Sequence, residues 1–261
     1  MSKFSAALVA IALMLLAGKA QAAPIIFDDF ESGMGHFAQH AGTSSTTNIL
    51  NTTTVNQLNS NELTTLNPAQ GSQSLQINIQ GNNAATPAGF PRVRFLSGGG
   101  TPASNVSFAT TAGTDGYIGF YYKVPAPGTL PNSLPSGLQL ALNLDAAGTG
   151  ASADAGIAKN AIMDGEWHLV EWNLDDPADW GPFQGVGGDG VLTNGETHTI
   201  DSIYFRYPTS TGWTGYSGQQ SLFIDFVAKS DSGSIAALVP EPASLGLLAV
   251  AGLGLIRRRR C

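Results

Sequence analysis

The chain has 261 residues, of which 43% are hydrophobic and 12% are charged, and it contains 32 Gly and 14 Pro. This apolar content is enough to bury a sizeable core, while the low charge and the many Gly and Pro exclude a coiled coil or a highly charged disordered chain. Residues 23–239 contain 18 acidic and six basic residues, a net charge of −12. A body this acidic is repelled by phosphate backbones, which excludes nucleic acid as an expected partner.

The first 22 residues predict a secretory signal peptide. A basic residue, Lys3, precedes an apolar run over 6–17, which ends at the small-residue site Ala20-Gln21-Ala22. This layout predicts export through the secretion translocon and cleavage by signal peptidase after Ala22. A buried core helix is the alternative, but a cleavage site directly behind the apolar run favours the signal peptide.

The body alternates apolar and polar residues with the period of two that half-buried strands show. The clearest alternation covers 74–80 and 138–144. Further strands are predicted over 25–30, 90–95, 117–124, 166–174, 199–207 and 222–228. Because no helical stripe of useful length interrupts them, residues 23–229 are predicted to be one all-β domain, an antiparallel β-sandwich of the jelly-roll type.

Three polar stretches, 41–68, 97–104 and 175–196, are predicted to be loops. Aromatic rings in Gly- and Pro-rich segments can stack on the apolar faces of sugar rings. Trp180 with Phe183, and Trp213 with Tyr216, are therefore candidate glycan contacts. The alternative is that these rings fold back onto the core and anchor their loops.

Support for catalysis is thin. The four histidines have no zinc-binding spacing, and no nucleophile elbow or nucleotide-binding glycine pattern occurs. Glu166 and Glu171 lie in one predicted strand and point to opposite faces, so they cannot flank one glycosidic bond. Cys261 is the one cysteine, so no disulfide is expected. The sequence favours a non-catalytic protein, with a polysaccharide-degrading or modifying enzyme and a purely structural matrix component as alternatives.

The C-terminal end predicts a membrane-directed tail. After a predicted linker at 230–239 come Pro240-Glu241-Pro242, an apolar run over 243–256 and four arginines, Arg257, Arg258, Arg259 and Arg260. As a helix the apolar run would reach roughly 21 Å, short of the roughly 30 Å hydrocarbon layer, which suits a transient transmembrane anchor. The arginines would stay in the cytoplasm and leave the body outside. A surface helix with a basic tail is the alternative.

This ordered tail, residues 240–261, resembles the PEP-CTERM sorting signal of Gram-negative, exopolysaccharide-producing bacteria. The resemblance implies that an exosortase-type membrane protease recognises the Pro-Glu-Pro segment and removes the tail. It implies export across the inner membrane, transient anchoring, and then a place at the cell surface or in the extracellular matrix. Exopolysaccharide is the further partner that this location implies. Cys261, behind the arginines, departs from the pattern.

Three segments of the body, 27–33, 71–75 and 222–227, occur in an order that resembles the galactose-binding-like jelly rolls among carbohydrate-binding modules. In that fold a structural calcium ion commonly lies where the first and last strands meet. The resemblance implies Glu31 and Asp225 as its carboxylate ligands, with carbonyl oxygens from the turn between Gly71 and Ser74.

Elementary electrostatics draws attention to the same place. Asp225 lies in a predicted strand between Phe223 and Val227, where an unpaired carboxylate would be costly. A hard cation with about six to eight oxygen ligands would relieve that cost. The alternative is that Asp225 only accepts hydrogen bonds from the protein.

Overall fold

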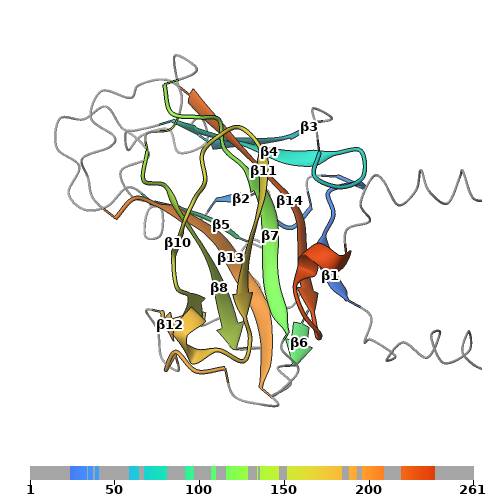
Figure 1. Cartoon of the computed structure of the whole chain (residues 1–261), viewed down its shortest axis with the longest axis vertical. Coiled ribbons are helices and arrows are strands. Elements are labelled where there is room, and N and C mark those ends of the chain that lie inside the picture. Colours follow the sequence, from blue (N-terminus) through green and yellow to red (C-terminus); the bar gives the residue numbers. More distant parts are fainter. Residues whose placement is uncertain are drawn as a thin grey trace, which may run out of the picture.

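The computed structural model describes residues 24–33, 35–37, 39–40, 59–64, 68–80, 92–96, 107–109, 116–128, 134, 136–146, 152–183, 188–192, 196–208 and 219–238. Within these ranges the chain forms two antiparallel β-sheets and two short 3-10 helices, and it contains no α-helix. The sheets pack face to face as a β-sandwich (Figure 1). This confirms the predicted all-β fold.

The first sheet has six strands in the order β11-β7-β14-β4-β3, with β1 also pairing with β14. Its strands are β1 (Ile25–Asp28), β3 (Asn59–Thr64), β4 (Ser74–Gln80), β7 (Tyr117–Lys123), β11 (Trp167–Asn173) and β14 (Gln219–Ser230).

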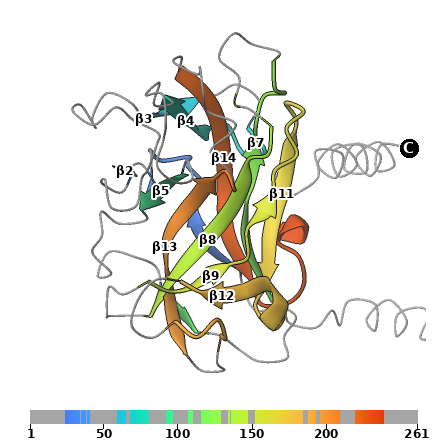
Figure 2. The same cartoon turned by 90° about the vertical axis from the view of Figure 1, so that its left-hand side faces the viewer.

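The second sheet has eight strands in the order β12-β9-β8-β13-β5-β2, with β10 also pairing with β8 and β6 with β13. Figure 2 shows this sheet facing the viewer, with β8 and β13 in its middle. Its strands are β2 (Gln39–His40), β5 (Arg92–Leu96), β6 (Ser107–Ala109), β8 (Gln139–Ala146), β9 (Ser152–Gly156), β10 (Lys159–Asn160), β12 (Trp180–Pro182) and β13 (Thr197–Arg206).

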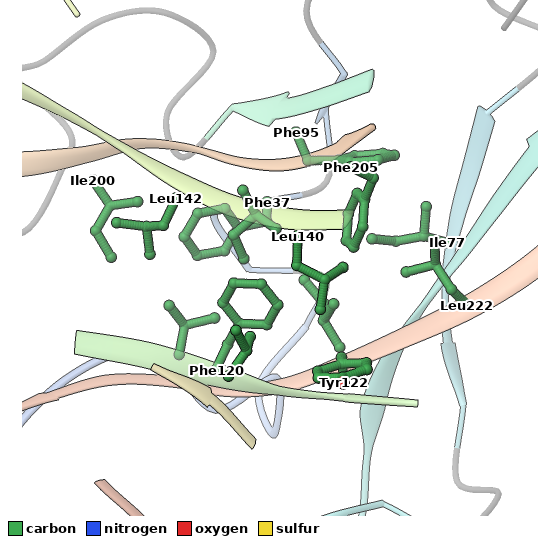
Figure 3. Packing of buried hydrophobic residues seen from close by; sticks show 14 of the residues in the cluster. Phe37, Ile77, Phe95, Phe120, Tyr122, Leu140, Leu142, Ile200, Phe205 and Leu222 are labelled. Carbon is green, nitrogen blue, oxygen red and sulfur yellow. The ribbon is translucent and has the colours of Figure 1, made fainter. Parts of the chain in front are cut away.

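The core lies between the two sheets, as the period-two pattern requires (Figure 3). Phe120 and Tyr122 of β7 point from the six-stranded sheet toward Leu140 and Leu142 of β8. Each of these four side chains is at least 97% buried. Alternate residues of β8 and β13 therefore point away from the core, and these outward positions form the floor of the candidate site described below.

Part of the predicted loop 175–196 is regular structure. A 3-10 helix, η3 (Pro177–Asp179), begins behind Asp176, whose carboxylate accepts the amide of Ala178, and β12 follows directly. Burial explains the difference, because Trp180 packs into the core and fixes the segment against β9. Likewise β3 forms within the predicted loop 41–68 by pairing with β4.

The segment predicted as a linker, 230–239, starts inside β14 and then packs against the sandwich as far as Leu238. Its 3-10 helix η5 (Ile235–Leu238) contacts β7 and β14, and Ile235 is fully buried. The carboxylate of Glu171 accepts hydrogen bonds from the Ser234 hydroxyl and the Ile235 amide, both at 3.0 Å. The body therefore continues directly up to the residues that precede the Pro-Glu-Pro segment.

Several sequence predictions lie outside the described residues. These are the signal peptide with its cleavage site at Ala20 and Ala22, the segment 240–261 with its apolar run, and the loop 97–104. In the ranges that the structure describes, no helix combines the length and the apolar character needed to cross a bilayer.

Candidate functional site

A hollow of about 290 Å³ lies on the outer face of the eight-stranded sheet, away from the core. Its floor follows from the strand registers, which place outward-facing residues side by side. Asn143 of β8 is paired with Ala155 of β9, Ala155 with Gly181 of β12, and Ala141 of β8 with Tyr204 of β13. The small side chains in this row leave the space that the hollow occupies.

The walls of the hollow are apolar and come from two connections beside β9 and β12. Ile157 follows β9 and is 48% exposed, and Phe183 follows β12. The Ile157 amide donates to the carbonyl of Asp179 at 2.8 Å, and the Ile157 carbonyl accepts the indole N–H of Trp172 at 2.8 Å. The wall at Ile157 is thus fixed from both sides before any ligand binds.

Polar groups and two guanidinium groups complete the lining. Asn143 donates to the Ser202 hydroxyl at 3.1 Å, and Tyr204 lies beside it in the floor. Arg92 of β5 and Arg206 of β13 are directly paired at the edge of the hollow, and Arg206 Nε donates to Gln139 Oε1 at 3.1 Å. Among the described residues that line the hollow, no side chain is acidic.

The four aromatic residues predicted from the sequence to contact glycan have different positions in the structure. Trp180 is only 4% exposed, and its indole N–H donates to the Asn173 carbonyl at 2.7 Å, so its ring is a buried anchor and offers no face to a sugar. Phe183 does line the hollow, and the Arg94 guanidinium lies 5.4 Å from its ring centroid. Trp213 and Tyr216 lie outside the described residues.

A second candidate site is the corner where β1, β14 and the segment before β4 meet. Along one edge of β14, β4 pairs with residues 219–224 and β1 pairs with residues 227–229. Asp225 occupies the gap between these two pairings and faces residues 68–73, which lead into β4. Glu31 reaches the same segment from behind β1. The topology therefore brings together the two carboxylates that the resemblance implied as metal ligands.

Both carboxylates are engaged by protein donors. The amides of Ala69 and Gln70 donate to Asp225 Oδ2 at 2.8 and 3.0 Å, and the Phe226 amide donates to Oδ1 at 2.8 Å. Asp225 is fully buried, and loss of hydration raises its pKa to about 7.

Glu31 differs because it lies at the surface of the corner. It accepts the Ser72 hydroxyl at 2.6 Å and the amides of Ser72 and Gln73 at 2.8 and 2.9 Å. These hydrogen bonds lower the pKa of Glu31, and the one from the Ser72 hydroxyl has the largest effect. Its charged form is therefore favoured, in contrast to that of Asp225.

The backbone at this corner is constrained. Phe30 and Phe226, each next to one of the two carboxylates, have positive φ angles of 58° and 45°. Gly71 has φ of 64°, and a Cβ atom there would lie 2.2 Å from Glu31 Oε1. Such conformations persist where the surroundings hold them in place, and they concentrate at binding sites and clamps.

The corner meets the requirements of calcium only in part. Two carboxylates supply a fraction of the about six to eight oxygen ligands that Ca²⁺ takes, and the contacts given by residues 69–73 come from N–H and O–H donors. Within the described ranges, no group of three or more His, Cys, Asp or Glu side chains could hold a metal ion. Ser74, whose main-chain carbonyl oxygen was predicted as a possible calcium ligand, is fully buried in β4. Calcium therefore stays a prediction.

Comparison with protein families decides the nature of the C-terminal end. Residues 238–260 match the family described as the PEP-CTERM protein-sorting motif. The C-terminal segment is a PEP-CTERM sorting motif. This motif implies processing by an exosortase, and with it export and membrane-associated sorting to the cell surface. No curated protein matches the chain at a significant level.

Solved structures that resemble the body include β-sandwich carbohydrate-binding modules. One is a carbohydrate-binding module of the β-sandwich superfamily, with 10% identity over 76% of this chain and 59% of that chain and a TM-score of 0.41. A module of Caldicellulosiruptor saccharolyticus, solved with mannohexaose, has 12% identity over 81% and 99% and a TM-score of 0.42. An endo-β-1,4-glucuronan lyase of the fungus Trichoderma reesei has 14% identity over 75% and 97% and a TM-score of 0.37.

This chain thus spans less than two thirds of the first of these structures. At such identities and TM-scores the likeness supports no statement about what this chain binds or does.

The arginines of the hollow are the residues that the sequence analysis missed. Polar and apolar residues alternate in Arg92-Val93-Arg94 of β5 and in Tyr204-Phe205-Arg206 of β13. Within each strand the polar side chains therefore point to the same face. This alternation can be read from the sequence. The sequence does not show that β5 pairs with β13, which is what brings Arg92 next to Arg206.

Proposed function

We propose that this protein is exported, processed at its PEP-CTERM motif and placed at the cell surface or in the extracellular matrix, where its sandwich binds glycan as a non-catalytic module. The hollow on the eight-stranded sheet is the binding site of this proposal. Exopolysaccharide is the polymer that the proposed location would offer. The PEP-CTERM motif supports the location, and the chemistry of the hollow supports the ligand class.

The observation that carries the proposal is the combination of groups in the hollow. A sugar ring has apolar C–H faces and a rim of hydroxyl groups, and so it needs a flat apolar wall beside a few fixed polar groups. Phe183 and Ile157 supply the wall, and Tyr204 and Arg206 supply polar groups, while Asn143 is fully buried and bonds to Ser202 in the floor. The volume of about 290 Å³ lies just below the roughly 300–1,000 Å³ found for small-molecule sites.

For the corner at Glu31 and Asp225 we propose a structural role. The two carboxylates hold residues 69–73 in place through their amide donors, and thereby join the first strand, the last strand and β4. A calcium ion bound there would be coordinated by the carboxylate oxygens of Asp225 and Glu31, and the remaining ligands would be main-chain carbonyls and water. This ion would stabilise the sandwich and take no part in glycan binding.

Affinity electrophoresis of the full-length protein through gels that contain single polysaccharides tests the proposed function. We expect retardation by at least one polymer, and we expect Phe183→Ala to reduce it while the thermal midpoint changes little. Ile162→Ala is the matched control, since Ile162 is 53% exposed and is not among the residues that line the hollow. Unchanged mobility with every polymer would contradict glycan binding. Release of reducing ends or unsaturated products would instead establish an enzyme.

A further inference from the structure

The basic residues of this acidic protein are unevenly placed. The body has six basic residues against 18 acidic ones, yet three of the six, Arg92, Arg94 and Arg206, belong to the neighbouring strands β5 and β13. All three point to the outer face, because Val93 and Phe205 between them are buried in the core. Half of the positive charge of the body therefore lies on one face of one sheet.

The three arginines have different surroundings. Arg94 forms an ion pair with Asp201, its Nε donates to the Ser202 hydroxyl at 3.1 Å, and its guanidinium lies near the Phe183 ring. Its charge is balanced, and it supports the aromatic wall. Arg92 and Arg206 line the hollow itself, where none of the described lining residues is acidic.

Arg92 and Arg206 offer two guanidinium groups to one ligand at the edge of the hollow. The two residues are direct cross-strand partners on the same face. An anion bound between them would contact both guanidinium groups. Guanidinium groups match the geometry of carboxylate and of sulfate or phosphate oxygens, which they bind with paired hydrogen bonds.

We propose that the hollow selects an acidic saccharide, whose anionic group is held by Arg92 and Arg206 while the sugar ring packs on Phe183 and Ile157. This inference rests on the proposed glycan-binding function and adds the charge of the ligand to it. It also explains how a protein with a net charge of −12 in its body can bind a negatively charged polymer, since the attraction is confined to one hollow. Both carboxylated and sulfated sugars carry the required chemistry.

The test uses matched polymers that differ only in charge. Binding of the full-length protein is measured to polygalacturonate and to its carboxyl-reduced form, and to dextran sulfate and dextran. We expect at least one anionic member to bind at least about tenfold more tightly than its neutral partner, because hydrogen bonds to charged groups are stronger than neutral ones. The pair that shows the difference identifies the anion as carboxylate or sulfate.

Variants locate the effect. Arg206→Gln and Arg92→Gln should each remove most of the preference for the anionic polymer, while Lys123→Gln should leave it unchanged. Lys123→Gln is the control because it also removes one positive charge, but from β7 of the other sheet. An equal loss in Lys123→Gln would overturn the assignment to the hollow. Equal binding of neutral and anionic partners would overturn the inference and leave glycan binding intact, whereas no binding to any polymer would overturn both.

Discussion

Arg206 of β13 lies directly opposite Arg92 of β5, so two guanidinium groups meet at the edge of the hollow in a protein that is otherwise strongly acidic. Binding that depends on this pair should depend on salt. Between about 0.01 and 1 M NaCl the screening length falls from about 30 to 3 Å. We expect acidic polysaccharide to bind progressively more weakly over this range.

Two variants separate charge from ring stacking in that experiment. Arg206→Gln should flatten the salt dependence because it removes one of the two charges. Phe183→Ala should lower the affinity by a similar factor at every salt concentration, since it removes an apolar contact. Titration calorimetry at several salt concentrations checks this. A wild-type affinity independent of salt would contradict an electrostatic role for the two arginines.

Asp225 should make stability depend on pH. Its folded pKa, raised by burial to about 7, exceeds the ordinary value of 3.8, so the folded state holds the proton more tightly. The resulting stabilisation is fully present below about pH 4 and is lost as the pH rises to about 7. A pKa difference of this size corresponds to at most roughly 4 kcal/mol of unfolding free energy.

Denaturant unfolding at several pH values, for the wild type and Asp225→Asn, isolates this contribution. Between about pH 4 and 7 the unfolding free energy of the wild type should change more steeply with pH than that of Asp225→Asn. The control Glu166→Gln, a change at an exposed acid, should follow the wild type. Calcium bound at the corner would hold Asp225 ionised and stabilise the wild type at pH 7 and above. Titration of metal-free protein that gives no heat up to millimolar calcium would contradict the calcium prediction.

Gly71→Ala should destabilise the protein more than a comparable change elsewhere. Gly71 and Gly128 both have positive φ angles, 64° and 76°, so alanine is strained at either position. At Gly128 a Cβ atom would meet nothing within 4 Å, whereas at Gly71 it would collide with Glu31. We expect a loss of about 1 kcal/mol for Gly128→Ala and of about 1–3 kcal/mol more for Gly71→Ala. Equal losses would show that Glu31 does not hold the turn.

Trp180 and Phe183 should respond differently to truncation, although they are three residues apart. Trp180→Ala removes a buried ring and should lower the unfolding free energy by about 3–5 kcal/mol. Phe183→Ala changes a half-buried ring at the hollow and should act mainly on polysaccharide affinity. Thermal melts beside affinity electrophoresis measure both effects. Normal stability of Trp180→Ala would contradict its place in the core.

Ile235→Ala should loosen the segment that joins the sandwich to the PEP-CTERM motif. Ile235 is fully buried, and its truncation should cost about 2–5 kcal/mol, against little for the exposed Ile162→Ala. Hydrogen exchange should show faster exchange of the Ile235 amide, which otherwise donates to Glu171. If protection of that amide is already low in the wild type, the segment is not docked as described.

Local pattern was sufficient for part of this structure. The alternation in 74–80 and 138–144 predicted strands β4 and β8, because a side chain in a strand points to alternate faces whatever its partner is. The PEP-CTERM motif could likewise be found from the sequence, since it is read as a short ordered run of residue types. By contrast, β12 and β3 were missed, because burial of Trp180 and pairing with β4 stabilise segments whose composition is typical of loops.

The sequence by itself determined the strand pattern, the acidic balance and the sorting motif, because each depends on residues that are neighbours in the chain. Only the tertiary structure decided which residues share a site. The pairing of β5 with β13 brings Arg92 to Arg206, and the gap between β4 and β1 along β14 brings Asp225 to residues 69–73 and places Glu31 on the same segment. The contacts of Arg92 with Arg206 and of Asp225 with Ala69 and Gln70 join residues more than 100 positions apart, and those of Glu31 join residues about 41 positions apart. Strand order and register, which local pattern does not specify, fix these contacts.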